Sequence, residues 1–373
     1  MMDTRRGSRR RLLGGALTVA GLGALGGVTY RALTGGPTME EAVDALIADA
    51  APPGVGLTLI ATSNGKTLYA KGFGESDPVG GVAATVETVY DIGSVTKQFT
   101  AAAIVRLWTL GELDPGDRLG RFFTGMGDKA EITVHQLLTH TSGLIDTLGP
   151  DDDPLSRSGL IDAMAASVPL AAPGVRYVYS NVGYSVLAAI VEELTSGSYE
   201  RFLADAFFAP LGMSRTGYLL PDWDRRDVAV EHGPDGLPLG RPNERTWGAN
   251  GPYWNLLGNG GVLSTATDMA AWSRALDGDA VLSAPARNRL FEPWVAEDAS
   301  ESSHYGYGWV MLDVGDVEVA WHNGGNGASY AEFARVSGGP SVFWATNEVA
   351  RSGRWNLEES DLAMRVLGLL LDP

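Results

Sequence analysis

Segments with the pattern of β-strands lie at both ends of this chain, and helical patterns lie between them. Near the start, alternating apolar and polar residues flank Asn64 and Gly65, a dipeptide that favours the left-handed conformations of a two-residue hairpin turn. Further strand candidates occur between residues 305 and 347, separated by glycine and polar turns. This order predicts an α+β fold, an α/β sandwich with one antiparallel sheet built from both chain ends, flanked by helices, and an inserted mainly helical region.

The helical patterns cover four segments in the middle of the chain and one at its end. They are residues 100–110, 134–140, 182–194, 269–276 and 357–371. For the second segment, Thr133 is the expected N-cap and Gly143 the expected stop. We expect a cleft where the helical region meets the sheet.

Residues 1–36 differ in composition from residues 37–373, which we expect to form one domain. Five arginines between Arg5 and Arg11 precede an apolar run from Leu12 to Val28. The string "SRRRLL" resembles a twin-arginine export signal, so we expect an exported, extracytoplasmic protein. No clear A-x-A cleavage site follows, so a cleaved signal and a membrane anchor within residues 12–30 are both open. A disordered basic tail is disfavoured because the apolar run is long.

Composition excludes several kinds of function. The chain has no cysteine, which rules out thiol nucleophiles, disulfides and thiolate metal sites. The first 36 residues hold six of its 28 basic side chains, so the remainder is more negative than the net charge of −17. Such a body repels nucleic acid, and we expect no nucleic-acid partner and a monomer.

The string "DIGSVTKQFT" places Ser94 and Lys97 three residues apart, a spacing that puts both on one face of a helix. The apolar pattern that follows predicts that Lys97 is buried at a helix start, where desolvation lowers the ammonium pKa and lets the amine accept a proton from Ser94. Alternatively, Lys97 extends to water and Ser94 only caps the helix. Ser63 and Lys66 repeat the spacing around the hairpin turn, so spacing alone is weak evidence.

Two later strings complete a resemblance. "YVYSNVGY" supplies Tyr179 and Asn181, and "AWHNGG" begins its third pattern at His322. Together with Ser94 and Lys97, these patterns resemble the serine β-lactamase and penicillin-binding protein family, in the branch of class C β-lactamases, D-alanyl-D-alanine carboxypeptidases and related esterases. The resemblance implies a β-lactamase/transpeptidase-like fold. The strings 253–255 and 304–306 imitate the second and third patterns, but the flanking residues and the chain order select the former.

The resemblance implies a catalytic role for three side chains. Ser94 would attack a carbonyl and form an acyl-enzyme, while Lys97 and Tyr179 would share the proton. A buried structural tyrosine is the alternative for Tyr179. Asn181 would orient both the substrate amide and the Lys97 ammonium.

The resemblance also implies substrate contacts along the third pattern. The substrate-binding residues would be Asn181, His322, Asn323 and Gly324, and the backbone N–H groups of Ser94 and Gly325 would form the oxyanion hole. Lysine is usual where this chain has His322, and an imidazole attracts carboxylates more weakly and in a pH-dependent way. This departure favours an esterase or peptidase-like hydrolase over a β-lactamase.

The predicted function is therefore an exported serine hydrolase that cleaves an ester or amide, with β-lactams and D-amino-acid peptides among the candidate substrates. We expect no cofactor and no metal. His232 and His304 have no paired ligand at zinc-like spacing, and for His135 and His140 helix-end hydrogen bonds are favoured over metal binding. Two other hypotheses are open: a relative that binds penicillin or peptidoglycan without turnover, and a membrane-tethered structural protein.

Overall fold

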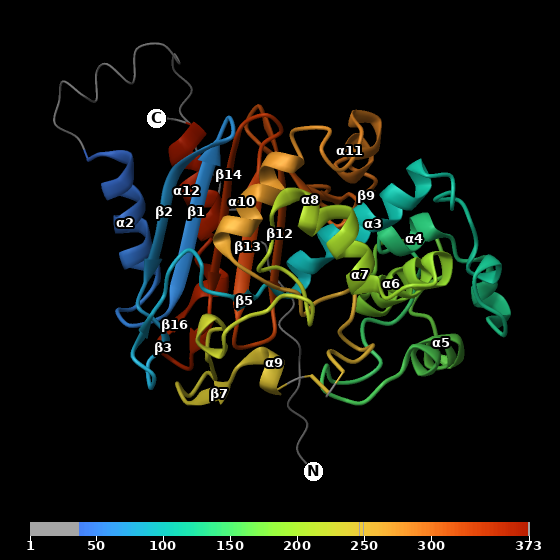
Figure 1. Cartoon of the computed structure of the whole chain (residues 1–373). Helices are drawn as coiled ribbons and strands as arrows, with labels where there is room; N and C mark the ends of the chain where they lie inside the picture. The colour runs from blue at the N-terminus through green and yellow to red at the C-terminus, as the bar shows by residue number, and fades with distance from the viewer. Residues whose placement is uncertain (1–36, 246, 249, 372–373) are drawn as a thin grey trace. The chain divides into compact units, whose positions relative to one another are not determined.

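The computed structural model describes residues 37–245, 247–248 and 250–371; the expected export segment, residues 1–36, lies outside them. Among the described residues, no helix is both long and apolar enough to cross a lipid bilayer. An eight-stranded antiparallel sheet has helices on both of its faces (Figure 1). The α+β class that the sequence predicts is confirmed.

The sheet joins the two ends of the described chain. In spatial order its strands are β2 (Lys66–Phe73), β1 (Leu57–Ser63), β14 (Pro340–Thr346), β13 (Tyr330–Arg335), β12 (Val317–Gly325), β11 (Val310–Val314), β10 (Ser303–Tyr305) and β9 (Val295–Ala296). Asn64 and Gly65 connect β1 to β2 with φ angles of 50° and 73°, as the hairpin prediction requires. β1 then pairs with β14, with Leu57 opposite Thr346 and Ser63 opposite Pro340.

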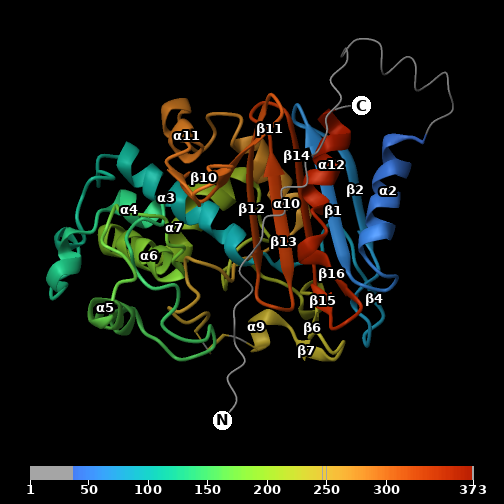
Figure 2. The ribbon, with the colours of Figure 1, turned by 180° about the vertical axis from the view of Figure 1, so that it is seen from behind.

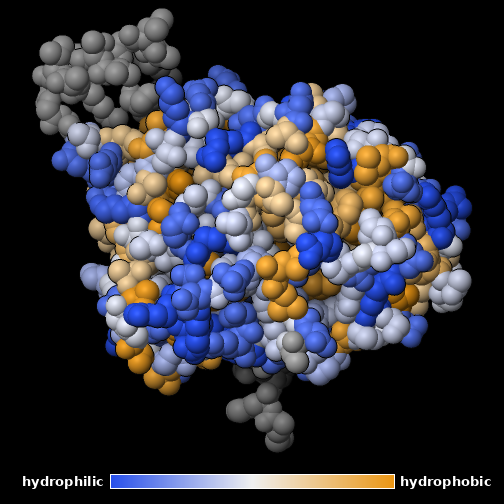
Figure 3. Space-filling view, viewed as in Figure 1, coloured by the Kyte–Doolittle hydropathy of each residue, from blue (hydrophilic) through white to orange (hydrophobic). Residues whose placement is uncertain are grey.

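Helices from both chain ends cover one face of the sheet. α2 (Met39–Ala50) and α12 (Leu362–Leu371) lie against this face, and Figure 2 shows α12 in front of the strands. α10 (Ala266–Ala275) packs on the opposite face against β1 and β14. Because both faces are covered, β1 is buried along nearly its whole length. On the molecular face in Figure 3, hydrophilic residues are interspersed with small apolar patches.

The inserted region is mainly helical. Its helices, apart from α10, are α3 (Lys97–Thr109), α4 (Val134–Leu138), α5 (Arg157–Ala166), α6 (Asn181–Thr195), α7 (Tyr199–Leu203), α8 (Ala209–Leu211), α9 (Pro242–Arg245) and α11 (Ala284–Leu290). Four small two-stranded sheets complete the fold: β3 (Glu75–Asp77) with β4 (Val82–Ala83), β5 (Tyr90–Asp91) with β8 (Leu263–Ser264), β6 (Glu231–His232) with β7 (Pro238–Gly240), and β15 (Ala350–Arg351) with β16 (Trp355–Asn356).

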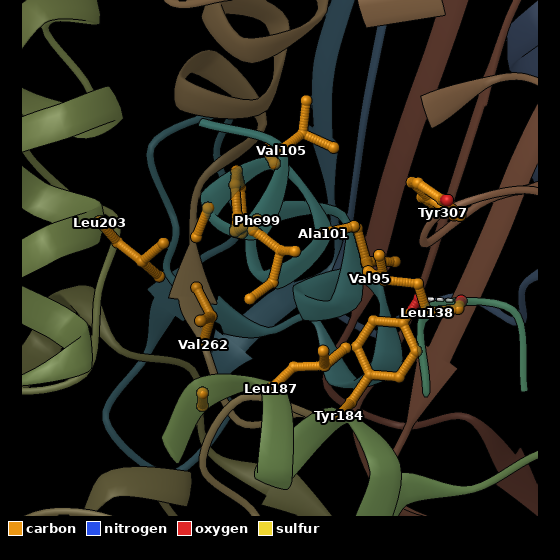
Figure 4. Close-up of a cluster of buried hydrophobic side chains, with 14 of the residues drawn as sticks. Val95, Phe99, Ala101, Val105, Leu138, Tyr184, Leu187, Leu203, Val262 and Tyr307 are labelled. Atoms are coloured by element: carbon orange, nitrogen blue, oxygen red, sulfur yellow. Dashed lines mark hydrogen bonds between the residues drawn. The ribbon is translucent and has the colours of Figure 1, made fainter. Parts of the chain in front are cut away.

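α3 is the central helix of the larger core. Every residue from Lys97 to Val105 is buried, so this helix is covered on all sides rather than along one stripe. Figure 4 shows Phe99 of α3 surrounded by apolar side chains from other segments. Its ring centre lies 4.9 Å from that of Trp272 and 5.1 Å from that of Phe208. Burial of such a side chain stabilises the fold by about 1.5–3 kcal/mol, which holds the start of α3 in place.

The helix predictions are confirmed in position but not at every end. The helix expected from residue 100 begins at Lys97 because it continues directly from a 3-10 turn. Thr133 caps α4 in a reciprocal capping box with Gln136, as expected. The prediction that Gly143 stops this helix is wrong: α4 ends at Leu138, and the chain turns at His140, which has a φ angle of 57°.

Candidate active site

Ser94 lies at a strand-to-helix turn. The chain leaves β5, passes through the 3-10 turn η1 (Gly93–Thr96) and enters α3. Gly93 has a φ angle of 50°, and a Cβ there would lie 2.3 Å from the backbone nitrogen of Gly325. Only glycine meets both conditions, so Gly93 lets the turn that carries Ser94 lie directly against the end of β12.

Lys97 is fully buried one turn after Ser94. Its Nζ donates to Ser94 Oγ (3.0 Å), Asn181 Oδ1 (2.7 Å) and the backbone oxygen of Asn259 (2.7 Å). Burial lowers the pKa of Lys97 to about 7, although the carboxylates of Asp146 and Asp151 partly oppose that shift. Near neutral pH a substantial share of the amine is therefore uncharged. A neutral amine offers a lone pair, and the Ser94 hydroxyl can then donate to it.

The second pattern lies around the same amine. Lys97 Nζ is 4.8 Å from the ring centre of Tyr179, and Asn181 begins α6. The Asn181 side chain accepts from Lys97 and donates through Nδ2 to Asp146 Oδ1 (2.9 Å). The structure thus brings together Ser94, Lys97, Tyr179 and Asn181, as the sequence predicts, although more than eighty residues separate the first pair from the second.

The end of β12 contributes backbone groups, rather than side chains, to the candidate site. A Cβ on Gly324 would lie 2.1 Å from the backbone nitrogen of Ser94, so this glycine is needed for the close approach. Ser94 is the second residue of a 3-10 turn, and the first N–H groups of such a turn have no partner inside it. The Ser94 N–H is therefore available to a ligand at this junction.

The register of β12 sets the direction of the Gly325 N–H. Asn326 N–H donates to Ser329 O (3.2 Å) and so points to β13. Successive N–H groups of an antiparallel strand point to opposite sides, so that of Gly325 points away from β13. On that side the ladder with β11 covers Val317 to Trp321, and η1 lies beside the end of β12. The Ser94 and Gly325 N–H groups thus occupy the junction where the predicted oxyanion hole requires two donors.

His322 is buried beside this junction and uses both ring nitrogens. Nδ1 lies 2.6 Å from the backbone oxygen of Asn323, and Nε2 lies 2.9 Å from Tyr305 Oη. A carbonyl oxygen can only accept, so Nδ1 carries a proton, and in the neutral ring Nε2 accepts from Tyr305. The His322 side chain is therefore held by the protein itself, and its predicted contact with substrate stays a prediction.

Asn323 is directed to the other side of the sheet. Its Nδ2 donates to Tyr330 Oη (2.8 Å), and that hydroxyl donates to Glu332 Oε1 (3.1 Å). Tyr330 belongs to the core under α2 and α12. Side chains alternate along a strand, so neighbouring residues His322 and Asn323 face opposite sides. The prediction that the Asn323 side chain binds substrate is therefore not supported by these contacts.

Sequence reasoning missed two groups around Lys97. Its third acceptor is a backbone oxygen, that of Asn259, which no side-chain pattern reveals. His140 was predicted only to form helix-end hydrogen bonds; its Nδ1 accepts from Ser180 N (3.1 Å), and its ring packs 4.3 Å from the Tyr179 ring. Burial holds the pKa of His140 well below its usual value, so this ring adds no positive charge near Lys97.

The repeated Ser63 and Lys66 spacing and the imitating string 253–255 make local structural contacts. Ser63 and Lys66 lie opposite each other at the β1–β2 turn, where Ser63 is half-buried and Lys66 is exposed. The Asn255 amide donates to the backbone oxygens of Pro150 and Asp153. In the part of the chain that the structure describes, no group of three or more His, Asp or Glu side chains could hold a metal ion.

The fold and the site together define a class of protein. A serine hydroxyl in contact with a buried, weakly basic amine, beside two backbone N–H groups, is the arrangement of a serine acyl-transfer enzyme. Comparisons with known proteins identify the family: the model of the Beta-lactamase family matches residues 39–353. The chain belongs to this family of serine hydrolases, and the resemblance that the sequence suggests is confirmed.

Individual proteins similar to this chain support the family assignment. Penicillin-binding protein 4 of Amycolatopsis lactamdurans is 32% identical over 329 residues, which cover 81% of this chain and 82% of that protein. Protein flp of Staphylococcus aureus (strain COL) is 25% identical over 228 residues; the match covers 58% of this chain and spans only 44% of that protein. The octameric penicillin-binding protein homologue from Pyrococcus abyssi is similar in structure, with a TM-score of 0.73, 27% identity, and coverage of 89% and 76% of the two chains.

Proposed function

We propose that this protein is an exported serine hydrolase that cleaves an ester or amide through an acyl-enzyme on Ser94. One observation carries the proposal: the Lys97 amine is fully buried, has a pKa lowered to about 7, and lies 3.0 Å from Ser94 Oγ. An amine with a pKa near neutrality has the basicity that suits a general base at physiological pH.

The proposed reaction has two halves. The neutral Lys97 amine takes the hydroxyl proton while Ser94 Oγ bonds to the carbonyl carbon, and the resulting oxyanion accepts from the Ser94 and Gly325 N–H groups. The intermediate then collapses: its bond to the leaving group breaks, and Tyr179 passes the proton from Lys97 to the departing oxygen or nitrogen. Water next attacks the acyl ester by the same route, which releases the acid and restores Ser94.

The charges near the site favour a substrate without a carboxylate. Asp146 and Asp151 lie close enough to raise the pKa of Lys97, so they add negative potential around the amine. The third pattern has no lysine, and His322 is bonded to Tyr305 and Asn323. We therefore propose that neutral esters and amides are better substrates than anionic β-lactams or peptides that end in D-alanine.

A parallel assay of p-nitrophenyl esters, nitrocefin and D-alanyl dipeptides tests this proposal. We expect ester cleavage to exceed nitrocefin turnover, and a fluorophosphonate to label the protein at Ser94. The Ser94→Ala variant should lose both the label and the hydrolysis, by ~10⁴-fold or more. Nitrocefin turnover above ester cleavage would reverse the substrate assignment, and no labelling of the wild-type protein would reject the hydrolase.

A second candidate is a penicillin-binding protein that forms a long-lived acyl-enzyme. The name of the Amycolatopsis lactamdurans relative favours it. Intact-mass spectrometry after mixing with benzylpenicillin separates the two: an adduct that persists for hours supports the binder, and an adduct that disappears within minutes supports the hydrolase.

Export is the part of the proposal that rests on the sequence of residues 1–36. The string "SRRRLL" supports a twin-arginine route. Replacement of Arg9 and Arg10 by lysine keeps the charge and should retain the protein inside the cell. Replacement of Arg5 and Arg6 by lysine is the matched control and should leave export intact. Equal extracellular amounts of both variants would reject this route.

A further inference from the structure

Asn326, on the turn after β12, uses its whole side-chain amide on the protein. Its Nδ2 donates to Asp91 Oδ2 (3.0 Å) and to Glu231 Oε1 (2.6 Å). Its Oδ1 accepts from the backbone nitrogens of Ala328 (3.0 Å) and Ser329 (2.9 Å). Two donated and two accepted bonds are the full capacity of a primary amide, so the direction of this side chain is fixed.

Asp91 connects this amide to the turn that carries the nucleophile. The carboxylate is 3% exposed, and its Oδ1 accepts from the backbone nitrogen of Gly93 (2.8 Å). Gly93 immediately precedes Ser94, and Asn326 immediately follows Gly325. The Asp91 carboxylate thus links Gly93, which precedes Ser94, to Asn326, which follows Gly325. Ser94 and Gly325 are the residues whose N–H groups form the proposed oxyanion hole.

Glu231 anchors the other side of the Asn326 amide. It is fully buried, and its Oε2 accepts from Arg245 Nε (3.1 Å) and Nη2 (2.5 Å). Two buried carboxylates therefore share one amide, and a guanidinium compensates one of them. Burial, and next to it the charge of Glu231, raise the pKa of Asp91 to about 7. Above this pH Asp91 is an anion and accepts well from both Gly93 and Asn326.

We infer that Asp91 and Asn326 are positioning residues that hold the two N–H donors of the oxyanion hole at the correct separation. This inference rests on the proposed function, because it assigns the network a task in the proposed acylation of Ser94. Neither side chain reaches the substrate; each acts through the backbone of its neighbour. Glu231 and Arg245 keep the Asn326 amide in the direction that Asp91 requires.

The first test is the isosteric variant Asn326→Asp, assayed at pH 8. It removes at least one of the two donated bonds, because a carboxyl group has no more than one O–H, and places a third carboxyl group between two others. A displaced oxyanion donor costs ~10²-fold in rate, so we expect kcat for p-nitrophenyl butyrate and the rate of fluorophosphonate labelling to fall by about that factor. KM should change by less than about threefold, because the ground-state carbonyl gains little from the oxyanion hole. Rates are normalised to the concentration of active sites.

The decisive variant reverses the direction of both bonds. Asp91→Asn, Glu231→Gln and Asn326→Asp are combined, so that residues 91 and 231 donate and residue 326 accepts. The new asparagine can still accept from Gly93 through its oxygen, and the new glutamine can still accept from Arg245. We expect at least about a tenfold recovery of kcat over Asn326→Asp alone, since the geometry is rebuilt with the opposite polarity.

Asn347→Asp is the matched control. This asparagine is also buried, and its Nδ2 donates to the backbone oxygens of Ser76 (3.1 Å) and Val230 (2.8 Å). It should lower the melting temperature without changing kcat per active site. Should Asn326→Asp fail to fold, Asp91→Asn serves in its place, because it keeps the acceptor for Gly93 and loses only the bond from Asn326.

The outcomes distinguish a failure of the positioning role from a failure of the proposed function. Wild-type rates per active site in both Asn326→Asp and Asp91→Asn would overturn the positioning role. So would a folded combined variant that shows no recovery. If the wild-type protein itself is not labelled at Ser94, the proposed function fails first, and the network then has only a structural role.

Discussion

The two walls of the candidate site are built in different ways. The wall formed by η1, α3 and α6 presents side chains, and its lysine, serine and asparagine are joined by direct hydrogen bonds. The wall formed by the end of β12 presents backbone, and its side chains His322 and Asn323 are bonded to Tyr305 and Tyr330 on other strands. The first wall therefore holds the groups proposed for proton transfer together with the Ser94 N–H group, and the second contributes a close backbone approach and the Gly325 N–H group.

The largest expected loss of activity comes from a substitution of Lys97 in the first wall. Lys97→Arg keeps the positive charge, but a guanidinium cannot lose a proton at working pH. We expect kcat/KM for an ester to fall by ~10³–10⁴-fold. Lys129→Arg is the matched control, because Lys129 is also buried and its Nζ donates to a backbone oxygen, that of Ala165 (2.9 Å). Equal activity of both variants would remove Lys97 from the mechanism.

The next effect comes from the second wall. In Gly324→Ala the new methyl group would lie 2.1 Å from Ser94 N and 2.4 Å from Ile92 O, both backbone atoms. The turn and the strand must move apart, so we expect a loss of ~10²-fold in kcat and a lower melting temperature. Gly368→Ala, where a Cβ meets nothing within 4 Å, should leave both unchanged or slightly raise stability. Unchanged kcat in Gly324→Ala would show that the close approach is dispensable.

The pH dependence of kcat/KM tests the role of the Lys97 amine without a substitution of Lys97. The pKa of Lys97 is about 7, and the neutral form is the base, so kcat/KM should rise with pH up to that value and then level off. Each unit below it should cost about tenfold. Asp151→Asn removes a carboxylate that raises the pKa of Lys97, so the midpoint should move to lower pH. A profile that falls between pH 6 and 8 would contradict a neutral amine.

The smallest expected effect is on selectivity at His322. His322→Lys replaces an imidazole with the more basic lysine amine at the second wall, and nitrocefin turnover relative to ester cleavage should rise by about three- to tenfold. The same change at His304, which lies on β10 in the imitating string, should leave the ratio unaltered. Steady-state rates on both substrates provide the measurement. A ratio that falls would mean that the carboxylate of a substrate does not approach this position.

Much of the fold follows from local patterns in the sequence. Asn64 and Gly65 predict their hairpin because few other residues adopt positive φ angles. Thr133 predicts the start of α4 because its hydroxyl satisfies an exposed N–H. That helix ends earlier than the sequence predicts, because the chain turns at His140, whose positive φ angle is uncommon for a residue other than glycine, before it reaches Gly143.

The residue types likewise indicate Ser94 and Lys97, because a lysine at the start of an apolar helix is expected to be buried, with a lowered amine pKa. What the linear chain could not specify is which face of a strand is turned to the candidate site and which distant backbone atoms lie there. His322 and Asn323 are neighbours with opposite surroundings, and the contact of Lys97 with the Asn259 carbonyl spans 162 positions. Such contacts depend on strand register and packing, which arise only when the two chain ends meet in one sheet.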